Sequence, residues 1–431
     1  MPQTHLQPQR DQILRDVLEH VHAREPLLVL EAPPGSGKTH VSLRAAVLAA
    51  HHGERVAVVT QTNAQADDFC RRMGREYPRI GVYRFLAREA DDIDLGSSCA
   101  LVRRERDLPV GPCIVVATGA KWATLREDAD FDLTLVDEAW QMRWADFMFL
   151  SRVAPRFVLI GDPGQIDPTV TVDVRRWETA RRPPHRAAPD LILADPSSGA
   201  VRRQLPVSTR LPHDTVELVR GFYDFPFDSW ASPGERHLVL PGASKADPID
   251  RALERLRAGS LSLLTLPTPD DGPPQDEDLE LAETVAKTVR RLLARDARAR
   301  TEDGEAPLTP SDIGVTATHR VMNARLVEAL GELASHVRVD TPERWQGLER
   351  KVMLAVHPLS GVTDPSAFDL STGRLCVMTS RHRVGLVVVS RDHVGDTLEG
   401  YLPVADQAVS RPDVTGRGHA QHLAAWRRLA G

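Results

Sequence analysis

The feature that most constrains this chain is a short glycine-containing loop near the N-terminus, Ala32-Pro33-Pro34-Gly35-Ser36-Gly37-Lys38-Thr39. An apolar run, Leu27–Leu30, precedes the loop, and a segment of helical pattern follows it. Successive backbone N–H groups of such a loop, together with the N-terminus of the next helix, form a cradle for anions. Lys38 would then reach the β- and γ-phosphates of ATP, and Thr39 would bind Mg²⁺. The residues expected to hold the nucleotide are Pro34, Gly35, Ser36, Gly37, Lys38 and Thr39.

One position departs from the usual form of this loop. Ala32 stands where the pattern normally has its first glycine. Alanine is small, so we expect the loop geometry to tolerate it.

A second apolar run ends in two acids, Leu133-Thr134-Leu135-Val136-Asp137-Glu138. A strand of this kind delivers Asp137 beside the phosphates, where a carboxylate holds Mg²⁺ through its water shell. Glu138 is then placed to orient and deprotonate the attacking water. Adjacent acids at a strand end are common on protein surfaces, so this run has weight only together with the loop at 32–39.

Apolar runs recur in both halves of the chain and alternate with helical patterns. Continuous runs of this length predict parallel strands covered on both faces. The expected strands are Leu27–Leu30, Val56–Thr60, Ile114–Thr118, Leu133–Val136, Phe157–Ile160, Ile313–Thr318, Val352–Val356 and Leu386–Val389. The clearest helix is Leu279–Leu293, and the interval from Asn63 to Thr118 reads as mostly helical. The expected linkers or surface insertions are 181–189, 267–278 and, more weakly, 302–310.

Length and composition limit the alternatives. The chain has 431 residues, of which 42% are hydrophobic and 26% charged, enough for two domains with their own cores. No apolar run approaches the ~20 residues needed to span a bilayer, and the segment from Met1 to Arg10 lacks an apolar signal core, so we expect a cytoplasmic protein without a membrane contact. Four cysteines form neither a CxxC pair nor a disulfide framework, and their spacing does not suit an iron–sulfur cluster.

The order of further motifs gives a specific resemblance. Asp137-Glu138-Ala139-Trp140-Gln141 resembles the DEAxQ box of superfamily 1 helicases, in the Upf-like branch (superfamily 1B). Gly161-Asp162-Pro163-Gly164-Gln165 resembles the next motif of that branch. Leu205–Arg210, Ile313–Arg320, Trp345-Gln346-Gly347-Leu348-Glu349 and Val377–Arg381 follow in the family's order, so the resemblance spans roughly residues 9–391.

The resemblance implies a fold and a set of roles. It implies two RecA-like P-loop domains in tandem, each a mostly parallel sheet covered by helices, which we place at 1–203 and 204–431. Gln165 would sense the γ-phosphate, Arg210 and Arg381 would act as arginine fingers, and Gly347 and Glu349 would face the nucleotide. An N-terminal glutamine would read the adenine, with Gln12 favoured over Gln9. The expected strand-facing residues are Thr62, Asn63, Thr118, Thr316, Arg320 and Thr341.

Two departures bear on specificity and strand separation. Thr209 stands where the branch usually has a tyrosine that stacks on adenine, so selectivity for ATP over other nucleotides should be weaker. No inserted wedge domain is evident, which favours translocation or remodelling over strong unwinding. Lys121 is placed either to touch a phosphate or to lie on the surface. Trp122, Trp140 and Trp345 either stack on bases or pack the domain core, and packing is the commoner role.

Two functions of different classes follow. The first is an ATP-dependent motor that hydrolyses ATP and binds or translocates on single-stranded DNA or RNA, with DNA favoured. The resemblance implies movement in the 5′ to 3′ direction, and a protein partner could supply a wedge or nuclease. The alternative is a helicase-like ATPase that acts as a nucleotide-gated switch for a protein partner. The net charge of −6 slightly favours the alternative. A nuclease has little support, since no acidic metal cluster beyond the ATP site is evident.

Overall fold

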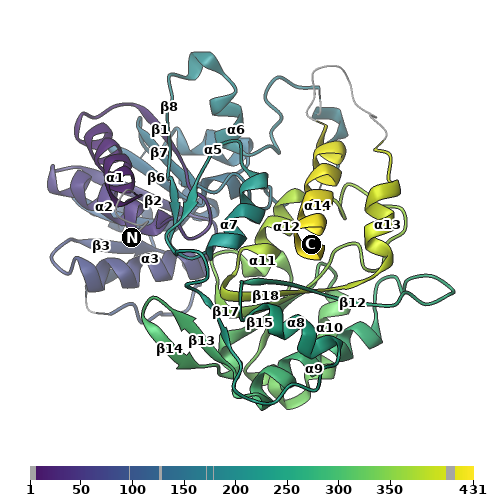
Figure 1. Ribbon diagram of the computed structural model, residues 1–431. Coiled ribbons are helices and arrows are strands. Elements are labelled where there is room, and N and C mark those ends of the chain that lie inside the picture. The colour runs from purple at the N-terminus through teal and green to yellow at the C-terminus, as the bar shows by residue number, and fades with distance from the viewer. Residues whose placement is uncertain (1–5, 97, 126–128, 171, 178, 404–412) are drawn as a thin grey trace. The chain divides into compact units, whose positions relative to one another are not determined.

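The structure, a computed structural model, describes residues 6–431 except 97, 126–128, 171, 178 and 404–412. These residues form two compact units (Figure 1). The first unit comprises 6–163 and 167–207, and the second comprises 164–166 and 208–431. Residues 1–5, part of the polar N-terminal segment, lie outside the described residues. No described helix is both long and apolar enough to cross a membrane.

The first unit is built on an eight-stranded sheet in which all neighbouring strands are parallel, in the order β4-β3-β5-β2-β6-β7-β1-β8. Its five central apolar runs form strands as predicted. The strands are β1 (Leu27–Glu31), β2 (Arg55–Thr60), β3 (Val82–Phe85), β4 (Cys99–Val102), β5 (Cys113–Thr118), β6 (Leu133–Asp137), β7 (Phe157–Gly161) and β8 (Val201–Gln204).

Both faces of this sheet are covered, which explains why its strands are apolar on both sides. In β1, Leu28 and Leu30 pack toward one layer of helices, and Val29 packs toward the other. The first layer consists of α1 (Leu6–His22), α2 (Lys38–His51) and α3 (Asn63–Glu76). The second consists of α4 (Gly119–Trp122), α5 (Trp144–Leu150) and α6 (Ala188–Leu193).

The second unit contains a five-stranded parallel sheet in the order β12-β18-β17-β15-β16. Its strands are β12 (Leu261–Leu266), β15 (Ile313–Thr316), β16 (Arg338–Asp340), β17 (Arg350–Val356) and β18 (His382–Arg391). The three runs predicted in this half form β15, β17 and β18, although β15 ends two residues before the predicted Thr318. The fold class is therefore confirmed: both units are α/β, with a parallel sheet between helices.

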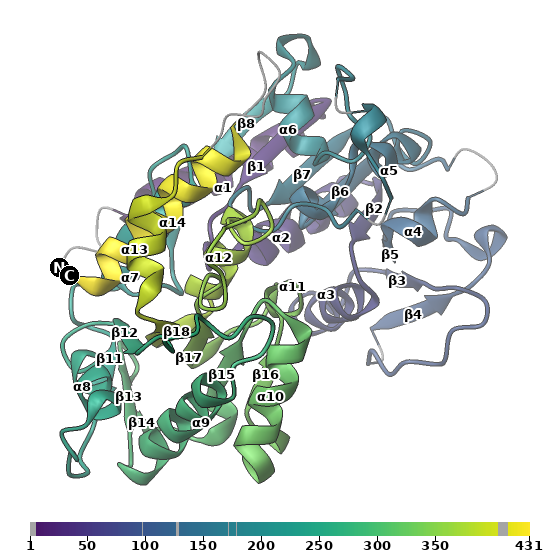
Figure 2. The ribbon, with the colours of Figure 1, turned by 90° about the vertical axis from the view of Figure 1, so that its right-hand side faces the viewer.

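Figure 2 shows helices above and below the five-stranded sheet. One face packs on α8 (Pro248–Arg255), α9 (Leu279–Ala294) and α10 (Arg320–Leu330). The other packs on α7 (His213–Val219), α12 (Thr372–Thr379) and α14 (Val414–Ala430). The predicted helix at 279–293 is thus confirmed as α9. The shorter elements are α11 (Pro342–Trp345), α13 (His393–Gly400), β9 (Val207–Ser208), β10 (Asp228–Ser229), β11 (His237–Val239), β13 (Arg298–Thr301) and β14 (Gly304–Pro307).

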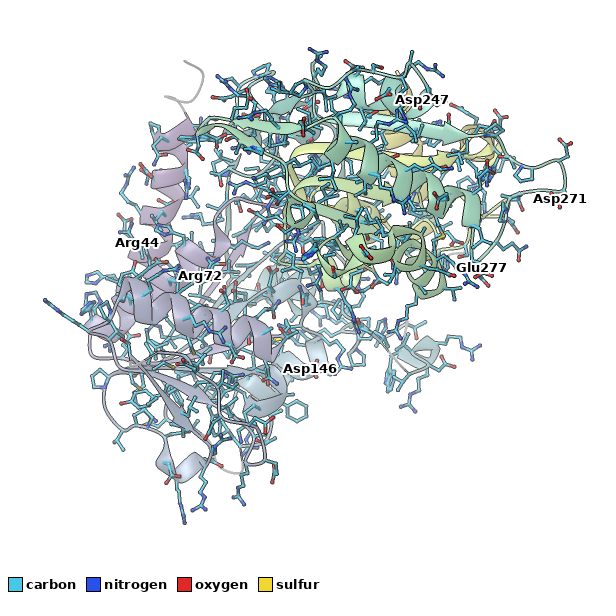
Figure 3. The ribbon with its side chains drawn as sticks, turned by 90° about the horizontal axis from the view of Figure 1, so that it is seen from below. Arg44, Arg72, Asp146, Asp247, Asp271 and Glu277 are labelled. Carbon is cyan, nitrogen blue, oxygen red and sulfur yellow. The ribbon has the colours of Figure 1, made fainter. Side chains whose placement is uncertain are left out.

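Three predictions about connecting segments need correction. The interval 63–118 is not mostly helical, because it contains β3 and β4 as well as α3. Segment 302–310 is not a linker, since β14 pairs there with β13 in an antiparallel hairpin. Part of 181–189 is structured, because Ala187 and Ala188 are buried at the start of α6. The proline-rich stretch 267–278 does form a loop, and Figure 3 shows Asp271 at its outer tip.

Candidate nucleotide site and nucleic-acid interface

The loop between β1 and α2 has the backbone that an anion cradle requires. Gly35 and Gly37 have φ angles of 72° and 91°, a region that residues with a Cβ rarely adopt. Ala32 does not have a positive φ, and its N–H donates to the carbonyl of Gly161 at 2.8 Å. A small residue is therefore sufficient at this position, and glycine is not needed. The Ser36 hydroxyl is buried and has no partner among the described residues.

Lys38 lies at the first residue of α2 and is held by two carboxylates of the same unit. Its Nζ is 3.6 Å from an oxygen of Glu138 and 3.6 Å from an oxygen of Asp162. Its side chain is only 12% exposed, and that of Asp162 is fully buried. Asp162 follows β7, Glu138 follows β6, and Lys38 ends the loop that follows β1. The ends of three strands therefore meet at this lysine. The sequence motif contained Asp162, but its pattern gave no role to this residue.

Asp137 and Glu138 stand at the end of β6 in a constrained turn. Burial and the adjacent Glu138 raise the pKa of Asp137 to about 7, although Lys38 opposes this shift. Ser42 of α2 donates to Asp137 at 3.4 Å. Glu138 has a φ of 53°, the left-handed region, which costs a residue with a Cβ about 1 kcal/mol or more. Such strain is frequent at functional sites and holds a side chain in one direction.

The turn after β6 also explains a glycine at the end of β7. A Cβ built on Gly161 would lie 2.8 Å from the backbone nitrogen of Ala139. Only glycine lets β7 approach the Glu138–Trp140 turn this closely. The two acidic motifs therefore depend on each other for their position.

The oxygen donors of this unit fit Mg²⁺. A buried carboxylate (Asp137) and a hydroxyl (Thr39) are hard oxygen ligands, the kind this ion prefers. Among the described residues, no group of three or more His, Cys, Asp or Glu side chains could hold a metal ion. An ion bound here would complete its coordination with water and phosphate oxygens, as is usual for Mg²⁺.

The structure does not place the predicted adenine-reading glutamine at the loop. Gln12 is exposed on α1, donates to Asp16 at 2.7 Å and accepts from Arg15 at 2.7 Å. Gln9 is also exposed. Instead, Arg10 of the same helix lies against the loop, with its Nη2 3.2 Å from where a Cβ of Gly37 would stand. Sequence reasoning missed Arg10, because an arginine on a helical pattern is ordinarily a solvated side chain.

In the second unit, the predicted arginine and glutamate residues form one charged cluster. Arg210 binds Glu349 with Nε 2.5 Å from Oε2, and Arg383 approaches the other oxygen at 3.2 Å. Burial favours the neutral acid, but the Arg210 and Arg383 guanidinium groups hold the pKa of Glu349 below its usual range. Arg381 also contributes to this shift and is itself buried. Arg383, two residues beyond the expected finger, was not predicted.

A buried arginine fixes the backbone that carries Arg210. Arg236 donates to the carbonyls of Thr209 and Arg210 and forms an ion pair with Glu302. Its residue exposure is 2%. The segment 302–310, predicted to be a linker, therefore supplies the carboxylate that orients this support.

Gly347 and Gln165 have local explanations. Gly347 has a φ of 76°, so the sharp turn before Glu349 requires glycine. Gln165 is 7% exposed, and its backbone lies against Gly373 of α12, where a Cβ would contact it. Its neighbour Gly164 lies against the Tyr223 ring in the same way.

The residues predicted to contact the nucleic-acid strand lie in three kinds of environment. Thr62 caps α3 and accepts from the Gln65 N–H at 3.2 Å, and Thr118 caps α4 and accepts from the Lys121 N–H at 3.2 Å. Asn63 accepts from Arg84 at 2.8 Å. These side chains have local structural partners. Arg320 is exposed and has no ion pair within the described chain.

Thr316 and Thr341 behave differently from Arg320. Thr316 is fully buried in β15, so this structure does not place it on a strand-facing surface. It was predicted from the resemblance of Ile313–Arg320 to a motif that contacts the nucleic-acid strand. Thr341 precedes α11 and is partly buried.

The aromatic alternatives are resolved in favour of packing. Trp122, Trp140 and Trp345 are at most 4% exposed. Their indole N–H groups donate to Val58, Asp190 and Val315 at 3.1, 2.7 and 3.1 Å. Lys121 has its ammonium group 4.1 Å from the centroid of the Phe85 ring, and burial lowers its pKa.

Comparison with known proteins agrees with the geometry of the first unit. Residues 9–175 match the family model described as AAA domain. No curated protein matches the chain. Among solved structures, the helicase nonstructural protein 10 of an arterivirus matches with a TM-score of 0.45 at 15% identity, over 88% of this chain and 63% of that chain.

Two further solved structures are similar to the same degree. A complex of the arterivirus helicase with DNA matches with a TM-score of 0.45 at 15% identity, over 88% of this chain and 64% of that chain. The PRRSV helicase matches with a TM-score of 0.44 at 15% identity, over 88% of this chain and 54% of that chain. The chain thus spans between about half and two thirds of the length of these helicases. The matched range 9–175 includes the loop at 32–39 and the ends of β6 and β7, so this part of the first unit is similar to AAA domains.

Proposed function

We propose that this chain is an ATP-dependent motor of the superfamily 1 helicase type that binds single-stranded nucleic acid. The observation that carries the proposal is Lys38, which stands at the start of α2 between two carboxylates, 3.6 Å from each. Without nucleotide, such a lysine is neutralised by Glu138 and Asp162. A phosphate group entering the cradle would take over Lys38 and release Glu138 to act on water.

The proposed roles follow from the two units. Mg²⁺ held by Thr39 and Asp137 neutralises charge on the phosphates when it is bound. Glu138 orients and deprotonates the attacking water, and its left-handed backbone holds the carboxylate in place. Gln165 senses the γ-phosphate. Arg210 and Arg381 stabilise the charge on the transferred phosphoryl group, a contribution of roughly 10³–10⁵ in turnover in related mechanisms.

The ion pair between Arg210 and Glu349 refines this proposal. An arginine finger must be available to the phosphate, and here Arg210 is held by Glu349 at 2.5 Å. We propose that nucleotide competes with Glu349 for Arg210, so that the arginine acts only when the site is loaded. Glu349 is then free to bind the nucleotide sugar, the role proposed for it in this family.

Single-stranded DNA is the proposed track, with movement 5′ to 3′, by resemblance to the Upf-like branch. Exposed Arg320 and the helix-capping residues Thr62 and Thr118 are the proposed contacts with the phosphate–sugar backbone. Because the formal net charge is −6, binding must depend on such local groups and should weaken steeply with salt.

Steady-state ATP hydrolysis with and without single-stranded DNA or RNA tests the proposal. We expect stimulation by one polymer, and loss of turnover in Lys38→Ala and Glu138→Gln. Glu138→Gln should still bind ATP, because the amide leaves the cradle intact. Arg44→Ala, a change of an exposed charge on the same helix, is the matched control and should hydrolyse normally.

Each outcome separates the candidate functions. Wild-type turnover in Glu138→Gln would remove Glu138 from its proposed role. Hydrolysis indifferent to both polymers would leave the ATPase and favour a nucleotide-gated switch that binds a protein partner.

A further inference from the structure

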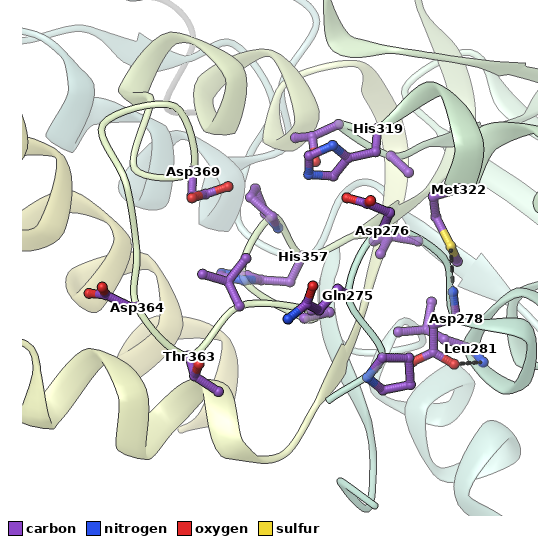
Figure 4. A pocket seen from close by; sticks show the side chains of 18 residues that line it. Gln275, Asp276, Asp278, Leu281, His319, Met322, His357, Thr363, Asp364 and Asp369 are labelled. Atoms are coloured by element: carbon purple, nitrogen blue, oxygen red, sulfur yellow. Dashed lines mark hydrogen bonds between the residues drawn. The ribbon is translucent and has the colours of Figure 1, made fainter. Parts of the chain in front are cut away.

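The second unit contains a cavity of about 330 Å³ that the nucleotide-site residues do not line (Figure 4). It lies where β15 and β17, neighbouring strands of the sheet, come to their ends. The chain leaves β15 through α10 toward β16 at one edge of the sheet, and leaves β17 through α12 toward β18 on the other side. In open parallel sheets, ligands bind beside strands whose connections diverge in this way.

The walls of the cavity accept hydrogen bonds and exclude anions. Asp276, Asp364 and Asp369 line it, and no lysine or arginine does. In Figure 4, Asp369 lies on one side of the pocket, and Asp276 lies on the other with His319 above it. Asp278, the fourth carboxylate, is already bound to Arg391 at 2.7 Å. A phosphate group would be repelled here, whereas a group with N–H donors would be bound.

The lining also contains apolar side chains and a buried histidine, which favour a partly apolar ligand. Leu281, Met322 and Val356 supply apolar surface. His357 also lines the cavity and is 2% exposed. Its Nδ1 accepts from the Leu359 N–H at 3.2 Å, which leaves Nε2 without a partner among the described residues. A buried ring nitrogen ordinarily has a polar partner, and this ring also packs against the rings of His422 and Trp426.

An aromatic stack stands at the rim. The rings of His319 and Phe368 have centroids 5.6 Å apart at 38°, and the Arg374 guanidinium is 3.9 Å from the Phe368 centroid. Phe368 is nevertheless 44% exposed. Arg320, next to His319 in the chain, is exposed and without an ion pair in the described chain. An exposed aromatic ring and nearby arginine side chains are the groups that bind a base and its phosphate in single strands.

We propose that this cavity is a nucleobase subsite, in which one base of the bound strand stacks at Phe368 and His319 and presents its amino edge to Asp276 and Asp369. Arg320 binds the adjoining phosphate outside the cavity. The subsite rests on the proposed binding of single-stranded nucleic acid and adds a base preference to it. Carboxylates accept from the N4 amino group of cytosine, whereas thymine and uracil present a carbonyl there. The strand is therefore read here in favour of cytosine over thymine and uracil.

Equilibrium binding of oligo-dC and oligo-dT of equal length, with the matched RNA oligomers alongside, tests the subsite. We expect the unmodified chain to bind dC about tenfold tighter than dT, the size of one good edge contact. Asp276→Asn should abolish this ratio, because an amide can also donate to the thymine carbonyl. Asp271→Asn, at the outer tip of the same loop, is the matched control and should keep the ratio.

The aromatic contribution is tested separately. Phe368→Ala should weaken binding of both oligomers about tenfold, and Phe368→Trp should retain it, which shows that the site is folded. Phe149→Ala, which removes a phenylalanine 55% exposed on the first unit, is the control for a nonspecific loss of apolar surface. Tryptophan fluorescence of Phe368→Trp should be quenched by oligo-dC if a base stacks there.

The outcomes distinguish this inference from the proposed function. Binding of both oligomers with equal affinity by the unmodified chain, unaffected by Phe368→Ala, overturns the subsite and leaves strand binding intact. No binding of any DNA or RNA oligomer overturns both the subsite and the proposed nucleic-acid motor.

Discussion

Positive φ angles occur at several of the residues predicted to hold the nucleotide. Gly35, Gly37 and Gly347 all occupy the left-handed region, as does Glu138 despite its Cβ. For the glycines, the sequence pattern already indicated a special backbone. For Glu138 it did not, because nothing in an Asp-Glu pair reveals how the chain turns after the strand. The strain became visible only with Gly161 packed against that turn.

A comparison of two glycines separates strain from function. Gly37→Ala should abolish ATP binding, because φ at this position is 91° and an added Cβ would meet Arg10 beside the phosphate cradle. Gly53→Ala has a similar φ of 85° but open space around it, so it should lower the free energy of unfolding by about 1 kcal/mol and leave hydrolysis unchanged. Nucleotide binding and thermal unfolding of both variants measure this. Equal loss of ATP binding in the two would contradict a local role for Gly37.

Among the elements, those with a continuous apolar signature were predictable and those held by polar contacts were not. β1 and β2 each contain four consecutive apolar residues, and three of the five residues of β6 are apolar, so their sequence suffices. β3 was missed because Arg84 interrupts its pattern, yet this arginine is fully buried. Its charge is compensated by residues distant in sequence, Asp67 at 2.8 Å and Asn63 at 2.8 Å. Only tertiary structure reveals such pairs.

The candidate site followed the same rule. The loop, Asp137 and Glu138 could be predicted because their chemistry is local in sequence. Arg10, Asp162 and Arg383 could not, because each acts through a neighbour that lies far along the chain. The burial of Thr316 was not evident either, since one residue of register decides whether a strand side chain is buried.

The buried pair of Arg84 and Asp67 joins α3 to β3 and can be tested as a unit. Arg84→Met should lower the free energy of unfolding of the first unit by about 3–5 kcal/mol, because it leaves Asp67 buried without a partner. Adding Asp67→Leu should recover most of this loss, since the uncompensated charge is removed. Denaturant unfolding of the single and double variants gives the coupling. Additive losses would show that the pair does not act together.

At the scale of the whole molecule, acid should affect the second unit first. Three of its histidines, His357, His382 and His422, are fully buried, and burial lowers their pKa, to about 4 for His382 and His422. Above about pH 6.5, these side chains are neutral in both the folded and the unfolded chain. Between pH 6.5 and 4 only the unfolded chain protonates His382 and His422, so the free energy of unfolding falls as pH decreases, by up to about 3 kcal/mol for each of these two.

One substitution checks this dependence. His422→Phe keeps an aromatic ring beside His357 and removes one titrating group, so its loss of stability between pH 6.5 and 4 should be smaller by one proton's contribution. His336→Gln, at an exposed position, should leave the profile unchanged. Urea unfolding at a series of pH values measures both. Parallel profiles for His422→Phe and the unmodified chain would contradict the assignment.

The wholly parallel first sheet has a consequence for how the chain comes to be folded during synthesis. Neighbouring parallel strands are never joined by a tight turn, so each pair forms only after a segment distant in sequence has been synthesised. β1, which carries the nucleotide loop, pairs only with β7 and β8, at 157–161 and 201–204. The ribosome must therefore synthesise almost the entire first unit before β1, and with it the nucleotide loop, can pair with its neighbouring strands. Until then its apolar strand stays exposed, and we expect slow maturation of this unit and a need for chaperones, with ATP recruited as a ligand only at the end.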